Sequence, residues 1–248
     1  MSSQVKLEFD VEMTCQKCVK SIENALTGVE GVKSFNVDLD KGQVIVEGTA
    51  GSEMVKNIIE KTGKRAVLKG MGGTQDHLGA AVSIMEVGKD SVRGLIRFIQ
   101  SDTDTLVIDG TVDGLIPGNK HAICVHECGD ISDGCNSCGE VFTSNSSHKP
   151  AEGEFGDIIA GSDGRAEFRI TSDRIKIWEM IGRSMIIHNC SSDRAHRPGQ
   201  PDERISCGII ARSAGLFQNN KKICACDGVT QWDERYKPVA GPGRQANL

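Results

Sequence analysis

The chain has 248 residues, of which 38% are hydrophobic and 4% aromatic, and its formal net charge is −5. This length allows two domains of ordinary size, and the acidic balance argues against a nucleic-acid partner, which would need a basic surface. No apolar stretch approaches the roughly 18 residues of a membrane span, and the first residues lack the apolar core of a secretion signal. We therefore expect a soluble intracellular protein, built from short strands and tight turns because it has 29 glycines.

The first 70 residues alternate between strand and helix patterns. Val5, Leu7, Phe9 and Val11 alternate with polar residues, which is typical of a strand with one buried face. Similar reasoning along the chain predicts the order βαββαβ over residues 5–11, 19–26, 35–39, 44–46, 54–59 and 66–68. This order indicates a ferredoxin-like domain over residues 1–70. The glycine-rich residues 71–77 are predicted to be a linker.

From residue 78 the pattern changes to short strand candidates separated by Gly, Asp and Asn turns, with no convincing helix between them. These candidates lie at residues 80–85, 94–100, 106–112, 123–126, 166–170, 184–188 and 206–211. Many short strands with regular turn signals favour an antiparallel sandwich or barrel, here over residues 78–213. Beyond it the periodicity disappears, and residues 214–248 are predicted to be a largely flexible tail.

Cysteine is the most informative residue, because ten cysteines in an intracellular chain indicate metal binding or redox exchange. Cys15 and Cys18 lie between the first strand and the first helix, where the positive helix end favours a thiolate. Two thiolates without a histidine make a soft site of low coordination number that suits Cu(I). A structural zinc site would need a second pair of ligands, which this domain lacks, and a thioredoxin-like pair does not fit the βαββαβ order. A chance pairing of two cysteines remains the third alternative.

The motif Met13-x-Cys15-x-x-Cys18 after the first strand of a βαββαβ unit resembles the heavy-metal-associated domain of copper chaperones and copper-pumping ATPases. The resemblance covers about residues 3 to 70. It implies a surface loop that holds Cu(I) between Cys15 and Cys18 and exchanges it with another pair of thiols.

The middle of the chain resembles copper/zinc superoxide dismutase. The matching segments are DGTVDGL at 109–115, VHECGD at 125–130, GC at 134–135, SDG at 162–164, IGR at 181–183 and RISCG at 204–208. The resemblance implies an eight-stranded Greek-key barrel and a disulfide between Cys135 and Cys207. From the residues themselves a loop-to-strand disulfide is plausible there, and two reduced buried thiols are the alternative.

Departures from the dismutase pattern bear on activity. Where the family has copper ligands, this chain has Cys124, His126 and His188, a set that could hold an ion or could be ordinary core residues. Val141 stands where the family has a histidine that bridges copper and zinc. His148 and Asp157 match two zinc ligands, but another zinc histidine is replaced near Glu154. Without the bridge we expect no useful dismutase activity and no resident zinc.

The dismutase resemblance also implies a surface for pairing. In that family the subunits meet through segments that correspond here to Gly129, Asp130, Ile181, Gly182, Arg183 and Ile209. By resemblance, the barrel pairs with a second copy of itself or with a true dismutase subunit. The barrel would then recognise its client by mimicry of the dimer partner.

The tail resembles the third domain of the dismutase copper chaperones, through CGIIARSAGLFQN at 207–219, KICACDGVT at 222–230 and WDER at 232–235. Cys224 and Cys226, one residue apart, can bind Cu(I) or exchange with a disulfide, and an exposed pair without a role is the alternative. The three parts together imply a chaperone that takes Cu(I) from an upstream donor, inserts it into superoxide dismutase and promotes the client's disulfide. A dismutase fused to a metal-loading domain and a copper buffer are the alternative functions. The resemblance implies work in the cytoplasm, with the nucleus and the mitochondrial intermembrane space as further candidate compartments.

Overall fold

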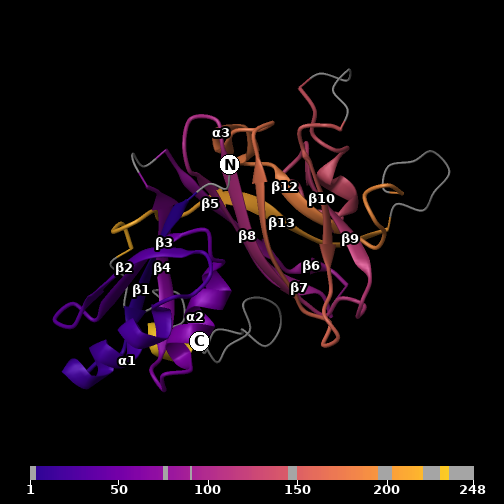
Figure 1. Ribbon diagram of the computed structural model, residues 1–248. Coiled ribbons are helices and arrows are strands. Elements are labelled where there is room, and N and C mark those ends of the chain that lie inside the picture. The colour runs from indigo at the N-terminus through magenta and orange to yellow at the C-terminus, as the bar shows by residue number, and fades with distance from the viewer. Residues whose placement is uncertain are drawn as a thin grey trace.

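The computed structural model describes residues 4–74, 78–89, 91–144, 150–194, 203–219 and 230–234. The chain forms a small α/β domain and a larger β domain that lie side by side (Figure 1). Within the described residues, no helix is both long and apolar enough to cross a membrane.

The amino-terminal domain has the predicted order of elements. These are β1 (Val5–Val11), α1 (Gln16–Leu26), β2 (Val32–Asp38), β3 (Gln43–Gly48), α2 (Ser52–Glu60) and β4 (Ala66–Gly73). The four strands form an antiparallel sheet in the order β2-β3-β1-β4. The prediction of a ferredoxin-like βαββαβ domain is therefore confirmed.

One face of this sheet carries the core of the domain. The side chains that alternate along β1, from Val5 to Val11, are buried together with Ile22 and Leu26 of α1 and with Val55 and Ile59 of α2. Both helices bury the apolar stripe that recurs at helical spacing, as expected for helices lying on a sheet. The opposite face of the sheet, which carries Lys6, Glu8 and Asp10, is called the open face below.

Strand β4 is longer than the sequence suggested. It continues to Gly73, so the first three residues of the predicted linker 71–77 belong to the sheet, and residues 75–77 lie outside the described part. The glycines are required because other backbones approach closely there. A Cβ at Gly70 would lie 2.5 Å from the carbonyl oxygen of Gly215, and one at Gly73 would lie 2.5 Å from that of Ser101.

The second domain is an antiparallel β-barrel. Its strands are β5 (Ala80–Met85), β6 (Val87–Gly88), β7 (Arg93–Gln100), β8 (Leu106–Asp113), β9 (Lys120–His126), β10 (Glu154–Ile159), β11 (Ala166–Ser172), β12 (Ser184–His188) and β13 (Arg204–Arg212). They pair in the order β10-β9-β12-β13-β5-β7-β8-β11, with the short β6 beside β13. The end strands β10 and β11 contact each other, which nearly closes the barrel. The prediction of an eight-stranded barrel is confirmed, and all seven predicted strands are present.

Four short elements of the barrel domain were not predicted. Strand β10 was missed because Gly156 adopts φ +85° and the register shifts between Glu154 and Asp157, which interrupts the alternation of a regular strand. The others are β6, a three-residue 3-10 helix, η1 (Asn136–Cys138), and a four-residue helix, α3 (Ile177–Met180). The expectation that no helix lies between the strands is therefore wrong for these two short turns.

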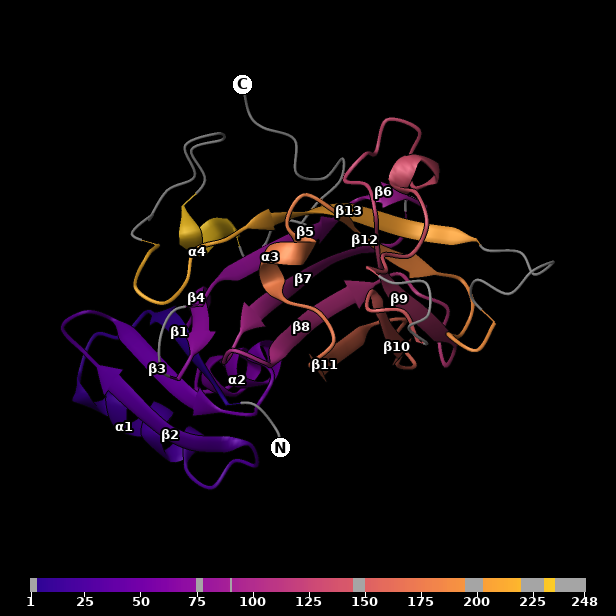
Figure 2. The same cartoon turned by 90° about the horizontal axis from the view of Figure 1, so that it is seen from above.

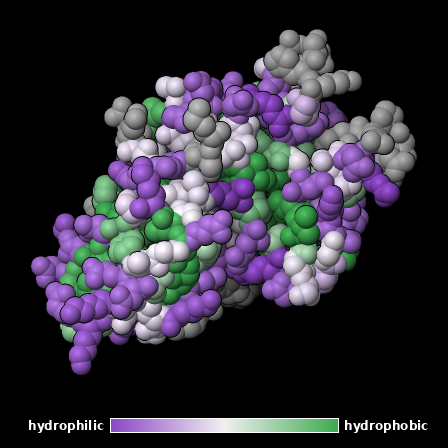
Figure 3. Space-filling view, viewed as in Figure 1, coloured by the Kyte–Doolittle hydropathy of each residue, from purple (hydrophilic) through white to green (hydrophobic). Residues whose placement is uncertain are grey.

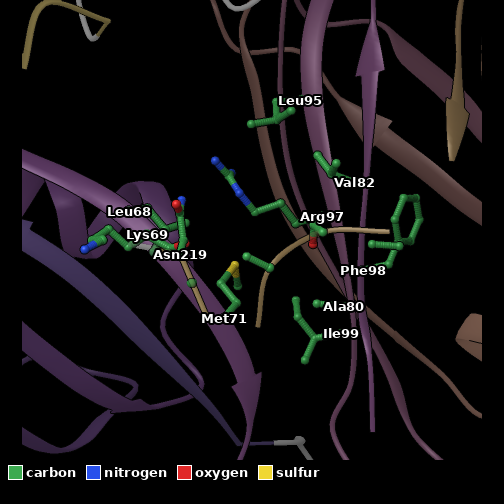
Figure 4. Close-up of a pocket in the computed structure, with 14 residues that line it drawn as sticks. Leu68, Lys69, Met71, Ala80, Val82, Leu95, Arg97, Phe98, Ile99 and Asn219 are labelled. Atoms are coloured by element: carbon green, nitrogen blue, oxygen red, sulfur yellow. The ribbon is translucent and has the colours of Figure 1, made fainter. Parts of the chain in front are cut away.

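The two domains are packed against each other rather than separated by a free linker. Ile99 of β7 and Val107 of β8 are buried in the same cluster as the core of the amino-terminal domain. A cavity of about 180 Å³ lies between β4 and the strands β5 and β7, and Figure 4 shows Arg97 reaching into it from the barrel. The orientation of the two domains is thus fixed by apolar burial as well as by polar contacts.

The chain returns from the barrel to the amino-terminal domain. Beyond β13, Gly215 lies on β4, and the short helix α4 (Gln231–Glu234) also contacts β4. Figure 2 shows α4 beside β4, at the side of the barrel where β13 ends. The described residues 214–219 and 230–234 of the predicted tail therefore contact the first domain, and the remainder lies outside the described residues.

Candidate copper site and pairing surface

The two amino-terminal cysteines lie together in the loop that joins β1 to α1, called the cysteine loop below (residues 13–18). Their Sγ atoms are 3.6 Å apart. Cys15 has an extended backbone and precedes the first residue of α1, and Cys18 lies within the first turn of that helix. Cys15 is exposed and Cys18 is buried. A metal ion held by both sulfurs would thus remain accessible from one side.

The loop favours the thiolate form of Cys18. Hydrogen bonds from the backbone and the hydroxyl of Thr14, followed by weaker ones from Cys15, lower the pKa of Cys18 from 9.0 to about 6. The Thr14 hydroxyl lies 3.7 Å from the Cys18 sulfur. A thiolate is the form that binds soft metal ions and exchanges with other thiols. The loop therefore presents a reactive sulfur at neutral pH.

The cysteine loop lies at the end of its domain that faces away from the barrel. Strand β4 begins with Ala66 opposite Val11, next to the loop, and ends with Gly73 against Ser101 of the barrel. The first residue of α2, Ser52, also contacts the barrel. A partner can consequently approach the two cysteines without meeting the barrel of the same chain.

The barrel brings two of its three candidate copper ligands together. Nε2 of His126 and Nε2 of His188 are 3.3 Å apart, and both side chains are fully buried. Nδ1 of His126 lies 3.0 Å from the carbonyl oxygen of Gly139. Cys124 is buried on the same strand as His126, but no three His, Cys, Asp or Glu side chains among the described residues are grouped to hold a metal ion. The suggested set of three ligands is therefore not assembled in this part of the chain.

Three residues correspond by sequence resemblance to metal ligands of the dismutases: Val141 to the histidine that bridges copper and zinc, and Asp157 and His148 to zinc ligands. Val141 forms an isolated β-bridge with His126. Asp157 accepts a hydrogen bond of 2.6 Å from the backbone of Ser192. His148 lies outside the described residues.

A disulfide joins Cys135 to Cys207, whose Cα atoms are 5.7 Å apart. It links the loop after β9 to strand β13 across 72 residues of sequence. Cys138 is buried in the same cluster, and burial raises the pKa of its thiol above the ordinary value, so this cysteine is a poor nucleophile at neutral pH. Cys128 is exposed and free.

The residues of the predicted pairing surface come together on the barrel. The backbones of Gly129 and Gly182 are in contact, and a Cβ at Gly129 would lie 3.4 Å from Cγ2 of Ile209. Arg183 donates a 2.8 Å hydrogen bond to the carbonyl of Glu127, in the segment that continues to Asp130. Ile181 packs partly against the barrel core, whereas Ile209 is 39% exposed. Figure 3 shows hydrophobic residues in separate groups on the face it draws.

Comparison with known proteins connects these parts. Residues 8–65 match the heavy-metal-associated domain, and residues 92–210 match copper/zinc superoxide dismutase. The chain is 46% identical to the human copper chaperone for superoxide dismutase, an alignment that covers 96% of this chain and 92% of the relative. The chain belongs to the copper chaperones for superoxide dismutase. The superoxide dismutase 1 copper chaperone of Saccharomyces cerevisiae is 31% identical, with 94% of each chain covered.

Members of this chaperone family are named as chaperones and not as dismutases, in keeping with Val141 at the bridging position. Cys224 and Cys226 lie outside the described residues. Thr14 was not predicted to belong to the site. Its hydroxyl, next to Cys15, could have indicated a hydrogen-bond donor to one of the thiolates. The contacts of the tail with the first domain were also not predicted, because they join residues more than 150 positions apart.

Proposed function

We propose that this chain carries Cu(I) on Cys15 and Cys18 and delivers it to copper/zinc superoxide dismutase. The observation that carries the proposal is the pair of sulfurs 3.6 Å apart, one with a pKa of about 6, on a domain joined to a dismutase-like barrel. Soft thiolates select Cu(I), and a site with only two of them leaves the ion open to attack by an incoming thiolate. The ion is cargo here, taken from an upstream donor and passed on by ligand exchange.

The proposed docking surface is the patch of Gly129, Asp130, Ile181 to Arg183 and Ile209 on the barrel. It would pair with an immature dismutase subunit as a heterodimer, and with a second copy of this chain as a homodimer. The exposed Ile209 beside two glycine backbones supports this, because a two-fold interface can bury an exposed apolar side chain of each subunit. Docking then selects the client, since a dismutase subunit has a barrel of the same family as the one in this chain.

Cys224 and Cys226 are proposed to act in the last steps. A reduced pair can take Cu(I) from the cysteine loop or pass it to the client. An oxidised pair can accept a client thiolate, which forms a mixed disulfide and releases one tail thiolate, and the second client thiolate then displaces the other. The client gains its disulfide and the tail becomes a dithiol, which dioxygen must oxidise again for another turnover.

The proposal places the chain in the cytoplasm, because the free thiols of Cys15 and Cys18 are maintained in a reducing compartment. The nucleus and the mitochondrial intermembrane space, where dismutase clients could also be met, are further proposed compartments. A resident zinc ion is not part of the proposal, since two ligands fall short of the four that a structural zinc site normally has.

Client activation tests the proposal. Copper-loaded protein is mixed with metal-poor dismutase under oxygen at limiting copper, and superoxide consumption is followed. The Cys15→Ser/Cys18→Ser variant should lose activation, the Cys224→Ser/Cys226→Ser variant should lose it or lose the client's disulfide, and Cys128→Ser serves as a matched control. Full activation by the first variant would contradict copper carriage on the cysteine loop, and full activation by the second would contradict the role of the tail.

The same assay separates the alternative functions. Appreciable superoxide consumption by the copper-loaded protein alone would mark it as a fused dismutase. Copper uptake that never activates a client would mark it as a copper buffer. Either outcome would overturn the proposal of delivery.

A further inference from the structure

Two carboxylates on the open face of the amino-terminal sheet, opposite the face that packs against α1 and α2, are buried. Glu8 and Asp10 are only 3% and 8% exposed. Burial of a carboxylate is costly unless it is paired or hydrogen-bonded. Asp10 forms an ion pair with Lys69 at 3.2 Å, and Glu8 accepts a 2.8 Å hydrogen bond from the side chain of Gln43. These two partners alone do not account for the low exposure of Glu8 and Asp10, so another part of the chain must cover this face.

The chain's own carboxy-terminal segment contacts this face. The backbone N–H of Phe217 donates a 2.6 Å hydrogen bond to Oε2 of Glu8, 209 residues away in sequence. Phe217 has φ +61°, in the left-handed region that a bulky residue adopts only under constraint. Gly215 is buried on Gly70, where a Cβ would collide with its carbonyl oxygen. The carboxy-terminal segment can therefore lie this close to β4 only because residue 70 is a glycine.

A second contact lies beside the cysteine loop. The guanidinium of Arg65 donates two hydrogen bonds, of 2.7 and 2.8 Å, to the carboxylate of Glu12. These two bonds fix the orientation of the guanidinium plane. The ring of Trp232 lies over it, with 5.4 Å from Cζ of Arg65 to the ring centroid, a geometry typical of a cation–π contact. Glu12 directly precedes the cysteine loop, and the Glu12 N–H donates to the carbonyl of Arg65.

We propose that the open face of the amino-terminal sheet is a docking surface for the carboxy-terminal segment of the same chain, and that Arg65 holds its far end through Trp232. The contacts run from Gly70 in the middle of the edge strand β4 to Arg65, next to the end of the domain that carries the cysteine loop. The segment is therefore attached to the domain at two points that flank residues 220–229 in sequence. Docking also occupies a sheet face that a foreign partner would otherwise find exposed. This inference does not depend on the proposed copper delivery.

Tryptophan fluorescence tests the docking directly, because the chain has only two tryptophans and the other, Trp178, is exposed. In the full chain with Trp178→Phe, Trp232 becomes the sole fluorophore. Its quenching by acrylamide should be weaker than in the chain unfolded by denaturant. Adding Arg65→Ala should raise the undocked population about two- to fivefold, the size expected for a partly exposed cation–π contact, and increase quenching.

Two further variants keep the test decisive. Gly70→Ala should also increase quenching, because its Cβ displaces Gly215, while circular dichroism checks that the domain remains folded. Lys61→Ala removes an exposed positive charge from the same domain, and we expect it to leave quenching unchanged. The inference is overturned if Trp232 is quenched as strongly as in the unfolded chain, if Arg65→Ala has no effect, or if Lys61→Ala has the same effect as Arg65→Ala.

Discussion

The carboxylate of Asp109, in strand β8 of the barrel, accepts a 3.0 Å hydrogen bond from the backbone N–H of Ser52, the first residue of α2. The Ser52 hydroxyl donates to the other oxygen of the same carboxylate. A carboxylate at the N-terminus of a helix satisfies an otherwise unpaired N–H and favours the helix dipole. Asp109 of the barrel thus caps the N-terminus of helix α2 in the amino-terminal domain.

The residues around this contact make it an interdomain junction. Arg169 lies 3.9 Å from Asp109 and donates a 3.1 Å hydrogen bond to the carbonyl of Ala50. Arg165 links Glu53 of α2 to Asp113 of β8. Because Asp109 is buried, its removal would leave the donors on both domains without their partner.

Asp109→Ala should therefore destabilise the protein and separate the unfolding of the two domains. We expect a loss of about 2 to 4 kcal/mol in the free energy of unfolding, as for a buried charge with several hydrogen bonds. Urea unfolding followed by circular dichroism and by tryptophan fluorescence should give coincident curves in the parent and divergent curves in the variant. Asp104→Ala is the matched control, because this carboxylate is 84% exposed and its contacts with Lys176 and Thr103 lie at the surface. Its effect should stay within about 0.5 kcal/mol.

Thr14→Val should raise the pKa of Cys18, because it removes the hydroxyl that lies 3.7 Å from the sulfur. The backbone hydrogen bond of Thr14, the largest cause of the lowered pKa, remains, so the midpoint should move only part of the way from about 6 toward 9.0. The lowered pKa stabilises the folded domain fully at high pH, and this stabilisation is lost as the pH falls through about 6. Alkylation of Cys18 by iodoacetamide, measured by peptide mass spectrometry between pH 5 and 9, reports the midpoint. Thr27→Val, at the other end of α1, should leave that midpoint unchanged.

The sequence predicts well those features that depend on neighbours along the chain. The alternation from Val5 to Val11 identified β1, and the spacing of Cys15 and Cys18 predicted that their sulfurs lie close together, which the distance of 3.6 Å confirms. Glycines misled the prediction near Gly70, because a glycine that admits another backbone looks the same as a glycine in a linker.

What the sequence could not predict depends on residues that meet only in the folded chain. The role of Asp109 requires Ser52, 57 positions earlier, and the place of Trp232 requires Arg65. The low pKa of Cys18 arises from the way the loop turns the Thr14 donors toward the sulfur. The contacts of Asp109 and Trp232 join residues that are far apart in sequence, so a periodic pattern within one segment cannot predict them. Strands and helices can be predicted because their patterns lie within one segment.

Ile209→Asp should weaken pairing of the barrel, because it replaces the exposed apolar side chain of the proposed surface with a charged one. We expect at least a tenfold rise in the dissociation constant for the homodimer and for the complex with dismutase, since a buried unpaired charge costs several kcal/mol. Analytical ultracentrifugation measures the homodimer, and titration with metal-poor dismutase measures the heterodimer. Ile116→Asp, at a 51% exposed position in a turn, is the control and should leave both constants unchanged. Equal weakening by both variants would show that the chosen surface is wrong.

Cys135→Ser should destabilise the barrel by removing the disulfide to Cys207. A disulfide typically contributes about 2 to 4 kcal/mol, so the melting temperature should fall by roughly 5 to 15 °C for a chain of this size. A reductant should lower the melting temperature of the parent by a similar amount and leave that of the variant unchanged. Cys128→Ser, which removes an exposed free cysteine on the neighbouring loop, should behave as the parent. A much smaller loss, with mass spectrometry detecting a new bond between Cys138 and Cys207, would show instead that the buried third thiol substitutes for Cys135 in the same cluster.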